Sequence, residues 1–396
     1  MPFPVQVMCI PDALAGRDVS GKAQTGSGKT LAFGLPLVER TKTSRKRRPR
    51  SLVLVPTREL ANQITDAIAP LAAARGLWIA PIYGGVSMVR QINALRAGVD
   101  IVVATPGRLN DLLERDELAL TDVSMVVLDE ADQMADMGFL PQVEHILDRI
   151  EGHAQTLLFS ATLDGQIGAL VRKYQQDPVR YEVVSDETMV DTLEQRFIGV
   201  RADDKVEVAA QISRHAHRAL MFVRTTHGAD RLVQQLERAG VEAIAIHGRL
   251  TQNKRERALA AFSRGAFKVM VATNVAARGL HIEGIDVVIH FDPPEDEKNY
   301  LHRSGRTARA GEDGMVVTLV QPEQEREVTQ IERAAGLDYT IVPMRSDDAR
   351  LQNLGAWTPP RGLPAAMRGP VFTGRSRSDG ARGRGAPSRA PRRYSR

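Results

Sequence analysis

Residues 125–132, with the sequence MVVLDEAD, join a short apolar run directly to a cluster of three acids. Similar runs rich in Val, Ile and Leu recur along the chain, and longer patterns of helical period separate them. The other runs are 51–55, 100–104, 156–159, 219–223, 243–246, 268–272, 287–290 and 315–320. Buried strands that alternate with helices are typical of parallel sheets, so the sequence predicts the α/β class.

The set of apolar runs starts again after residues 185–194, an acidic stretch with few apolar residues. We interpret this stretch as a linker between two α/β domains, which would span residues 1–184 and 195–342. From Gly355 onward Gly, Pro, Ser and Arg dominate, and such a composition cannot build a packed core. We therefore predict a disordered basic tail over residues 343–396.

Composition excludes several classes of protein. Hydrophobic residues make up 43% of the 396 positions, which rules out wholesale disorder. The single cysteine, Cys9, excludes an internal disulfide and a cysteine-cluster metal site. No stretch approaches the roughly 18 apolar residues that a membrane-spanning helix needs. We expect a soluble, cytoplasmic protein with no membrane partner.

The net charge of +5 hides a strong asymmetry along the chain. Residues 361–396 hold ten arginines and one acid, Asp379, so they carry +9 and leave −4 for the rest. A mildly acidic body with a strongly basic tail is typical of a protein that binds a polyanion.

Polar strings follow four of the predicted strands of the first domain, at the point where each strand ends. They are 56–60 (PTREL), 105–108 (TPGR), 129–132 (DEAD) and 160–162 (SAT). In open parallel sheets, ligands bind outside the carboxyl ends of the strands. We therefore expect all four strings to converge on one edge of the first sheet.

A phosphate-binding loop is predicted at residues 23–30 (AQTGSGKT), although its first position is alanine where the generic pattern has glycine. Its backbone N–H groups and the following helix favour a polyphosphate. Lys29 would reach the terminal phosphates and Thr30 could ligate magnesium. Asp129 fits a second magnesium contact, and Glu130 is placed to orient or deprotonate an attacking water.

A second charged string, residues 302–309 (HRSGRTAR), lies in the predicted second domain. Arg306 and Arg309 are three residues apart, so on a helical turn both face one way. Because 277 residues separate Lys29 from Arg306, the two can meet only across a cleft between domains. Arginines that reach a transferring phosphoryl group in this way contribute about 10³–10⁵ in rate. The alternative is a basic surface patch for nucleic acid.

These strings resemble the motifs of the DEAD-box ATP-dependent RNA helicases, in that family's order and spacing over about residues 2–320. Further matching strings are 84–85 (GG), 222–225 (FVRT), 247–248 (HG), Gln252 with Arg255, and 272–280 (ATNVAARGL). The resemblance implies two tandem RecA-like domains that close on ATP, Mg²⁺ and RNA together. It also implies RNA-stimulated ATP hydrolysis, coupled to local, non-processive unwinding or remodelling of RNA duplexes and ribonucleoprotein, including ribosomal particles.

The functional residues of that family carry over to this chain position by position. The catalytic positions are Lys29, Asp129, Glu130, Arg306 and Arg309, with magnesium at Thr30 and Asp129, partly through water. The ATP-binding positions are Gln6, Ala23, Gln24, Thr25, Gly26, Ser27, Gly28, Lys29, Thr30, Gly279 and His281. The positions that couple the two sites are Asp132, Ser160, Thr162 and His302. The RNA-binding positions, which hold a backbone without reading sequence, are Thr57, Arg58, Gly85, Thr105, Arg108, Gly248 and Thr273.

Four residues depart from the pattern of the family. Phe3 stands where threonine is usual, and Asn274, His281 and Arg249 each replace a common aspartate. His281 falls where a carboxylate accepts a hydrogen bond from the ATP ribose, so we expect weak apparent affinity for ATP. Asn274 and His281 favour the alternative of a non-catalytic or weakly catalytic RNA-binding clamp, whereas the intact catalytic positions favour the helicase.

A basic run, residues 42–50, precedes the predicted strand at 51–55 and contains six lysines and arginines. It fits either a solvated loop or an auxiliary contact to RNA.

Overall fold

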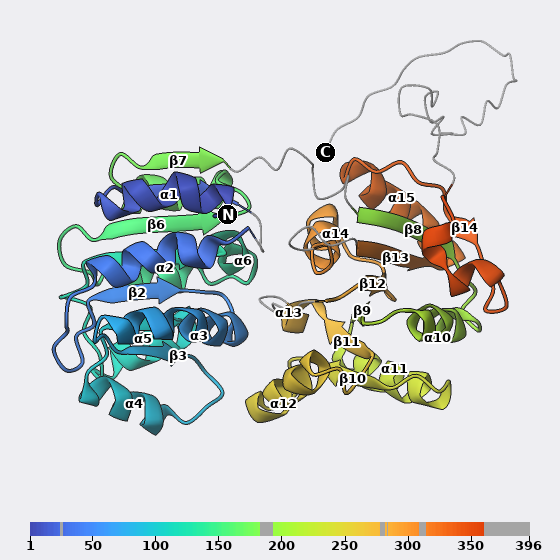
Figure 1. The fold of residues 1–396 in the computed structure, drawn as a ribbon, viewed down its shortest axis with the longest axis horizontal. Helices are drawn as coiled ribbons and strands as arrows, with labels where there is room; N and C mark the ends of the chain where they lie inside the picture. Colours follow the sequence, from blue (N-terminus) through green and yellow to red (C-terminus); the bar gives the residue numbers. More distant parts are fainter. Residues whose placement is uncertain (24–26, 183–192, 278–281, 283, 309–313, 360–396) are drawn as a thin grey trace, which may run out of the picture.

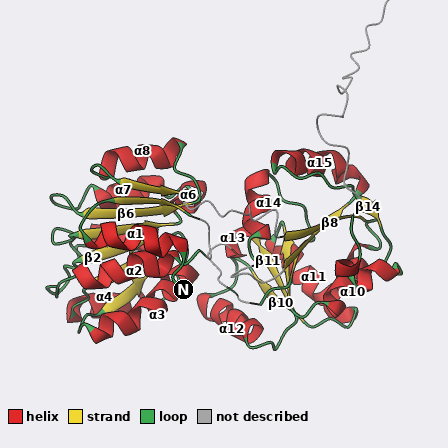
Figure 2. Cartoon of the chain, turned by 45° about the horizontal axis from the view of Figure 1, so that its top comes forward, coloured by secondary structure: helices red, strands yellow, loops and turns green. Residues whose placement is uncertain are grey.

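The computed structural model describes residues 1–23, 27–182, 193–277, 282, 284–308 and 314–359. These residues form two seven-stranded parallel sheets, one in each half of the chain (Figure 1). Helices cover both faces of each sheet (Figure 2). No helix within the described ranges is long and apolar enough to cross a membrane.

The first sheet has the strand order β3-β4-β2-β5-β6-β1-β7. Its strands are β1 Val19–Lys22, β2 Ser51–Leu54, β3 Ile79–Ile82, β4 Ile101–Ala104, β5 Met125–Asp129, β6 Gln155–Ser160 and β7 Val179–Glu182. The helices are α1 Pro4–Leu14, α2 Lys29–Arg40, α3 Arg58–Ala74, α4 Met88–Ala97, α5 Pro106–Glu114, α6 Ala131–Asp136, α7 Leu140–Leu147 and α8 Gly165–Tyr174. Every neighbouring pair of strands is parallel, as the sequence predicted.

The second sheet repeats this arrangement with the order β10-β11-β9-β12-β13-β8-β14. Its strands are β8 Leu193–Gly199, β9 Ala219–Val223, β10 Ala243–Ile246, β11 Val269–Thr273, β12 Val287–His290, β13 Gly314–Val320 and β14 Val342–Pro343. The helices are α10 Lys205–His215, α11 Thr226–Arg238, α12 Gln252–Ser263, α13 Asn274–Ala277, α14 Glu297–Ser304 and α15 Glu325–Ala334. Strands of equal rank in the two sheets, such as β1 and β8, therefore occupy equivalent places.

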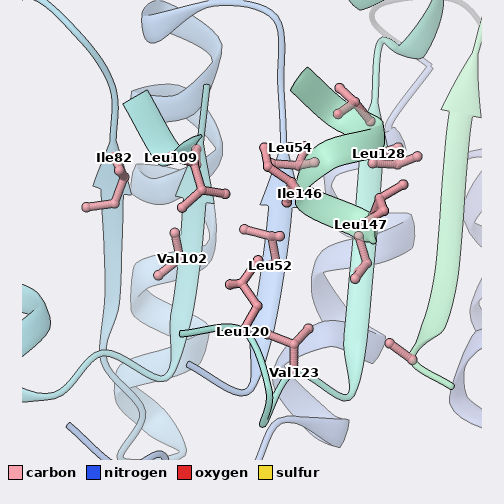
Figure 3. Packing of buried hydrophobic residues seen from close by; sticks show 14 of the residues in the cluster. Leu52, Leu54, Ile82, Val102, Leu109, Leu120, Val123, Leu128, Ile146 and Leu147 are labelled. Carbon is pink, nitrogen blue, oxygen red and sulfur yellow. The ribbon is translucent and has the colours of Figure 1, made fainter. Parts of the chain in front are cut away.

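The central strands are apolar throughout because both of their faces are buried. Along β2, Leu52 and Leu54 belong to one apolar cluster, whereas Val53 lies in the cluster on the opposite face. Figure 3 shows Leu52 and Leu54 with Leu128 of the adjacent strand and Ile146 of α7 in the first cluster. This two-sided burial explains why the sequence shows continuous apolar runs here instead of alternation.

The second domain is longer than the sequence predicted. Strand β8 begins at Leu193, two residues before the predicted boundary at 195. The prediction of a disordered tail from residue 343 is wrong for residues 343–357, because short 3₁₀ helices follow β14 and bury Leu351 and Leu354 against the second sheet. Arg196 also stacks on Trp357, with 5.6 Å from its Cζ to the ring centroid. The predicted tail over 360–396 lies outside the described residues.

Candidate functional site

The predicted phosphate loop meets helix α1 at Gln6. The side-chain amide of Gln6 donates to the Gly28 carbonyl oxygen (3.1 Å), and its Oε1 accepts from the Phe3 N–H (3.0 Å). Gly28 has a left-handed φ of 86°, and a Cβ there would lie 2.8 Å from both the Gln6 and the Phe3 side chains. Glycine is therefore required where α1 packs against the start of α2. The predicted residues Gln24, Thr25 and Gly26 lie outside the described residues, and Ala23 and Ser27 flank them.

Lys29 and Asp129 face each other at the carboxyl ends of β1 and β5. The Lys29 Nζ lies 3.5 Å from the Asp129 Oδ1, and both side chains are less than a tenth exposed. Burial raises the pKa of Asp129 to about 6, although the neighbouring Lys29 ammonium opposes that rise. A buried carboxylate of this kind is a place where a second cation would be stabilised.

The oxygen donors at this corner fit magnesium. Mg²⁺ commonly binds through one or two carboxylates together with substrate phosphates and water. Asp129 supplies such a carboxylate, and the hydroxyl of Thr30 follows Lys29 in the first turn of α2. Within the described ranges no group of three or more His, Cys, Asp or Glu side chains gathers as a metal cluster. The donor set therefore fits a metal shared with a phosphate ligand.

Glu130 and Ser160 link the strand ends to the helix that follows. Glu130 has a left-handed φ of 52°, which ends β5 abruptly, and its N–H donates to the Asp129 Oδ1 (3.0 Å). The buried Ser160 Oγ accepts from the N–H groups of Asp132 (3.2 Å) and Thr162 (3.3 Å). The Ser160 carbonyl oxygen also accepts from the Ala23 N–H at the start of the phosphate loop (3.0 Å). Ser160 thus connects three of the predicted strings.

The arginine string of the second domain forms a pocket of its own. His302 and Arg306 line it together with Phe222, Asn274 and Arg303, and Arg306 is only 5% exposed. Gly279, His281 and Arg309, which were predicted to join this region, lie outside the described residues.

Arg303 is a site residue that our sequence analysis did not single out. Its Nε donates to the Asn274 Oδ1 (2.6 Å), and its Nη1 donates to the Asp292 carbonyl oxygen (2.7 Å). Its Cζ lies 5.2 Å from the ring centroid of Phe222, and burial lowers its pKa to about 10. As the first arginine of the string HRSGRTAR, it could have been recognised from its motif.

An ion pair between the two domains brings residues 302–308 of the second domain towards Asp129 and Glu130 of the first domain. The Lys298 Nζ on α14 lies 2.7 Å from the Asp136 Oδ1 on α6. Helix α6 directly follows Glu130, and Arg306 comes two residues after the end of α14. The region of Arg306 therefore approaches the region of Glu130 across the domain boundary.

A cleft of about 460 Å³ separates the two domains beside this contact. Its lining comes from both domains: Pro56, Thr57, Arg58, Glu59, Gly84, Thr105, Gly107, Arg108, Asp111, Met137, Phe139, Gly248, Leu250, Arg255 and Val275. Five of the predicted RNA-binding residues are in this set. Gly85 and Thr273 are not, although each is a chain neighbour or near neighbour of a lining residue.

The first-domain wall of the cleft carries two arginines, Arg58 and Arg108, and two acids, Glu59 and Asp111. Burial lowers the pKa of Arg58, and the nearby cations of Arg255 and Arg108 act in the same direction while Glu59 opposes them. Helices α3 and α5 begin at this wall, and helix N-termini favour phosphate. The Arg58 guanidinium also packs on Gly85, where a Cβ would lie only 2.0 Å from its Nη1. The wall therefore suits a polyanionic backbone.

Glu59 and Arg255 join the two domains inside the cleft. The Arg255 Nε lies 2.8 Å from the Glu59 Oε1, and neither side chain is more than 10% exposed. Both residues lie in or beside motifs identified in the sequence. Their pairing could not be predicted, because 196 positions separate them along the chain.

Comparisons with known proteins agree with this geometry. A family model described as "DEAD/DEAH box helicase" matches residues 3–170, and one described as "Helicase conserved C-terminal domain" matches residues 204–311. The DEAD-box ATP-dependent RNA helicase CshA of Bacillus subtilis is 40% identical over 332 residues, which cover 83% of this chain and 67% of that protein.

Solved structures show the same two-domain fold. Dbp5 of S. cerevisiae bound to RNA and ADP BeF3 matches with a TM-score of 0.76 and 28% identity, over 88% of this chain and 90% of that one. A DEAD box protein from Methanococcus jannaschii matches with a TM-score of 0.52 and 34% identity, over 87% of this chain and 93% of that one.

Proposed function

This chain belongs to the DEAD-box family of ATP-dependent RNA helicases, and we propose that it hydrolyses ATP at the Lys29–Asp129 corner to remodel RNA held in the interdomain cleft. The observation that carries the proposal is the contact of both domains around one cleft, which is lined by Arg58, Arg108 and the N-terminal ends of α3 and α5. Hydrolysis and RNA binding would then depend on the same closure of the two domains.

The nucleotide would be held mainly by the first domain. Lys29 and the backbone of the phosphate loop would bind the phosphates, Gln6 would lie beside the base, and Glu130 would orient the attacking water. Magnesium, when bound at Asp129 and Thr30, neutralises charge that develops on the phosphates. Arg306, with Arg309, would supply positive charge from the second domain, while Gly279 and His281 would complete the nucleotide pocket.

RNA would be held through its backbone and without strong sequence preference. Thr57 and Thr105 begin helices whose N-termini line the cleft, and Arg58 and Arg108 add guanidinium groups there. Contacts of this type position a strand but read no bases. We infer that single strands and short duplexes bind, and that the enzyme unwinds or remodels them locally, including in ribonucleoprotein or ribosomal particles.

Coupling between the two sites would run through buried hydrogen bonds. The Ser160 Oγ accepts hydrogen bonds from the N–H groups of both Asp132 and Thr162. Movement of the 160–162 loop would therefore displace the start of α6. His302 would act from the facing pocket of the second domain. The proposed location is the cytoplasm, because the proposed substrates, ATP and RNA, occur there together.

A non-catalytic clamp is the competing function, and one argument for it weakens in the structure. Asn274 replaces a common aspartate, yet its Oδ1 still accepts a 2.6 Å hydrogen bond from Arg303. The neutral amide therefore accepts a hydrogen bond from the arginine string without carrying a charge.

The test is steady-state ATP hydrolysis by the full chain, with and without single-stranded RNA, beside a Glu130→Gln control. We expect RNA to stimulate turnover in the parent chain and the control to bind RNA with little turnover. A parallel strand-displacement assay should show release of short duplexes that requires hydrolysable ATP. RNA binding without any turnover in the parent chain would favour the clamp and refute the helicase.

A further inference from the structure

An exposed aromatic residue lies on the first domain away from the interdomain cleft. Trp78 is 71% exposed, although tryptophan is usually well buried. It directly precedes β3, the edge strand of the first sheet, so it lies at the amino ends of the strands. The predicted ligand-binding strings all lie at the opposite, carboxyl ends. Neither the nucleotide corner nor the cleft therefore accounts for this side chain.

The buried carboxylate of Asp100 fixes Trp78 beside the basic run at residues 42–50. Its Oδ2 accepts from the Trp78 N–H (2.7 Å), and its Oδ1 accepts from the Ser44 N–H (2.5 Å). The Trp78 carbonyl oxygen accepts in return from the N–H groups of Asp100 (2.8 Å) and Ile101 (3.0 Å). One side chain thus holds the backbone of Trp78 and the backbone of the basic run close to each other.

The basic run is only partly neutralised. Arg47 and Arg48 each lie 3.5 Å from an acid, Glu117 and Asp122 respectively. Lys42, Arg45 and Lys46 are exposed, and the ion pairs within the described ranges include none of them. Three solvated cations therefore remain beside the exposed indole.

The edge strand β3 connects this surface with the cleft. The chain runs from Trp78 along β3 to Gly84, which lines the cleft. At about 3.3 Å of rise per residue, six extended residues span roughly 20 Å. A flexible strand that leaves the cleft beside Gly84 could reach Trp78 by following the partly buried edge strand β3.

We propose that Trp78, with Lys42, Arg45 and Lys46, forms an auxiliary surface for single-stranded RNA that extends beyond the cleft. Proteins that hold single strands combine a positive groove with aromatic side chains on which bases stack, and this surface offers both. The basic run is then an RNA contact and not merely a solvated loop. The proposal rests on RNA being the ligand of the cleft, as proposed above.

The test follows the fluorescence of Trp78 in the full chain. The chain has two tryptophans, Trp78 and Trp357, so Trp357→Phe leaves Trp78 as the single reporter. A single-stranded oligoadenylate of about 20 nucleotides should quench Trp78, because stacking on a base alters the indole. Adding Lys42→Gln, Arg45→Gln and Lys46→Gln should raise the RNA concentration needed for half quenching and flatten its salt dependence.

Matched controls separate stacking from charge. The double variant Arg326→Gln and Arg333→Gln removes exposed cations from α15, on the far domain, and should leave the Trp78 titration unchanged. Inorganic polyphosphate should not reproduce the quenching, and equal quenching by polyphosphate would overturn the stacking claim.

Affinity measurements without a fluorescence change give a second test. In the parent background, Trp78→Ala should weaken binding of the 20-nucleotide RNA about fivefold or more and leave binding of an RNA just long enough for the cleft unchanged. Equal losses for both lengths, or none for the longer one, would overturn the proposal. RNA-stimulated ATP hydrolysis with no response at Trp78 would refute this inference alone, whereas absence of any RNA binding would refute the proposed function as well.

Discussion

The two domains share one sheet topology and differ in what they place at its carboxyl edge. Strands β1 and β8 occupy equivalent places, and the helix that follows each one begins with a buried lysine. Lys29 begins α2 after β1, and Lys205 begins α10 after β8. Each lysine lies 3.5 Å from an aspartate at the end of the strand two places away in the sheet: Asp129 ends β5 in the first domain, and Asp292 follows β12 in the second. The scaffold therefore repeats a charge pair along with the strand order.

The loops before these lysines make the difference. The first domain has the glycine-rich loop 23–28, whereas the second has 200–204 (VRADD), with two acids and no glycine. Lys205 is enclosed by its own domain, with its Nζ 3.5 Å from the Gln321 Oε1 and 4.5 Å from the ring centroid of Phe291. The repeated scaffold therefore carries the sequence pattern of a phosphate loop in the first domain and not in the second.

The largest expected effect tests what the second domain contributes instead of a phosphate loop. Arg306→Ala should lower the turnover number for ATP by about 10³–10⁵-fold, because the variant lacks the guanidinium that would stabilise negative charge on the transferring phosphoryl group. Binding of ADP, which lacks that group, should change little. A variant with near-parental turnover in steady-state kinetics would place the second domain outside the chemistry.

Replacing the two lysines tests the comparison directly. Lys29→Ala should lower turnover by about 10²–10³-fold, since a donor to the developing charge is lost. Lys205→Met should leave turnover near that of the parent but lower the melting temperature, because Asp292 loses its buried partner. Equal losses of turnover in the two variants would mean that the paired positions are not functionally distinct.

The bridge between the domains should have an intermediate effect. Arg255→Gln breaks the buried pair with Glu59 and should weaken RNA stimulation of ATP hydrolysis by about 5–150-fold, the usual range of coupling between sites. Glu59→Gln should behave alike, and the double variant should be no worse than either single one. Additive losses in that double-mutant cycle would show that the contact does not act as a pair.

The smallest effect concerns pH at the nucleotide corner. Because the pKa of Asp129 is raised to about 6, the carboxyl becomes protonated below that pH and loses its charge for magnesium. We expect kcat/KM for ATP to fall about tenfold per pH unit below 6, since that ratio reports the free enzyme. The stability contribution has the opposite sign: it is fully present below the unfolded pKa of 3.8 and is lost as pH rises through 6. A flat profile from pH 7 to 5 would contradict this assignment.

The sequence predicted the strands that carry a continuous apolar run, and most of these strands are buried on both faces. All nine apolar runs became strands, from β2 to β13. The missed strands include β7 and β3, which lie at edges of the first sheet and are only partly buried, and β1, whose residues VSGK are mostly polar. The folded segment 343–357 was missed because its few buried side chains, such as Leu351, are scattered among charged residues.

The candidate site divides in the same way. Positions tied to local patterns, such as Lys29 at the start of a helix or Glu130 after a strand, were predicted from their strings. The pairs Glu59–Arg255 and Lys298–Asp136 were not, because they depend on how the domains meet. The role proposed for Trp78 was not predicted either, because the sequence does not show that its ring is exposed.

The most direct test of the account is the affinity for single-stranded RNA with and without AMP-PNP and magnesium. If nucleotide and RNA share one closed arrangement of the domains, AMP-PNP should tighten RNA binding about 5–150-fold in the parent chain. The same addition should do little in Arg306→Ala, which lacks the proposed contact across the cleft. An RNA affinity that AMP-PNP leaves unchanged in the parent chain would contradict the claim that the two sites are closed together.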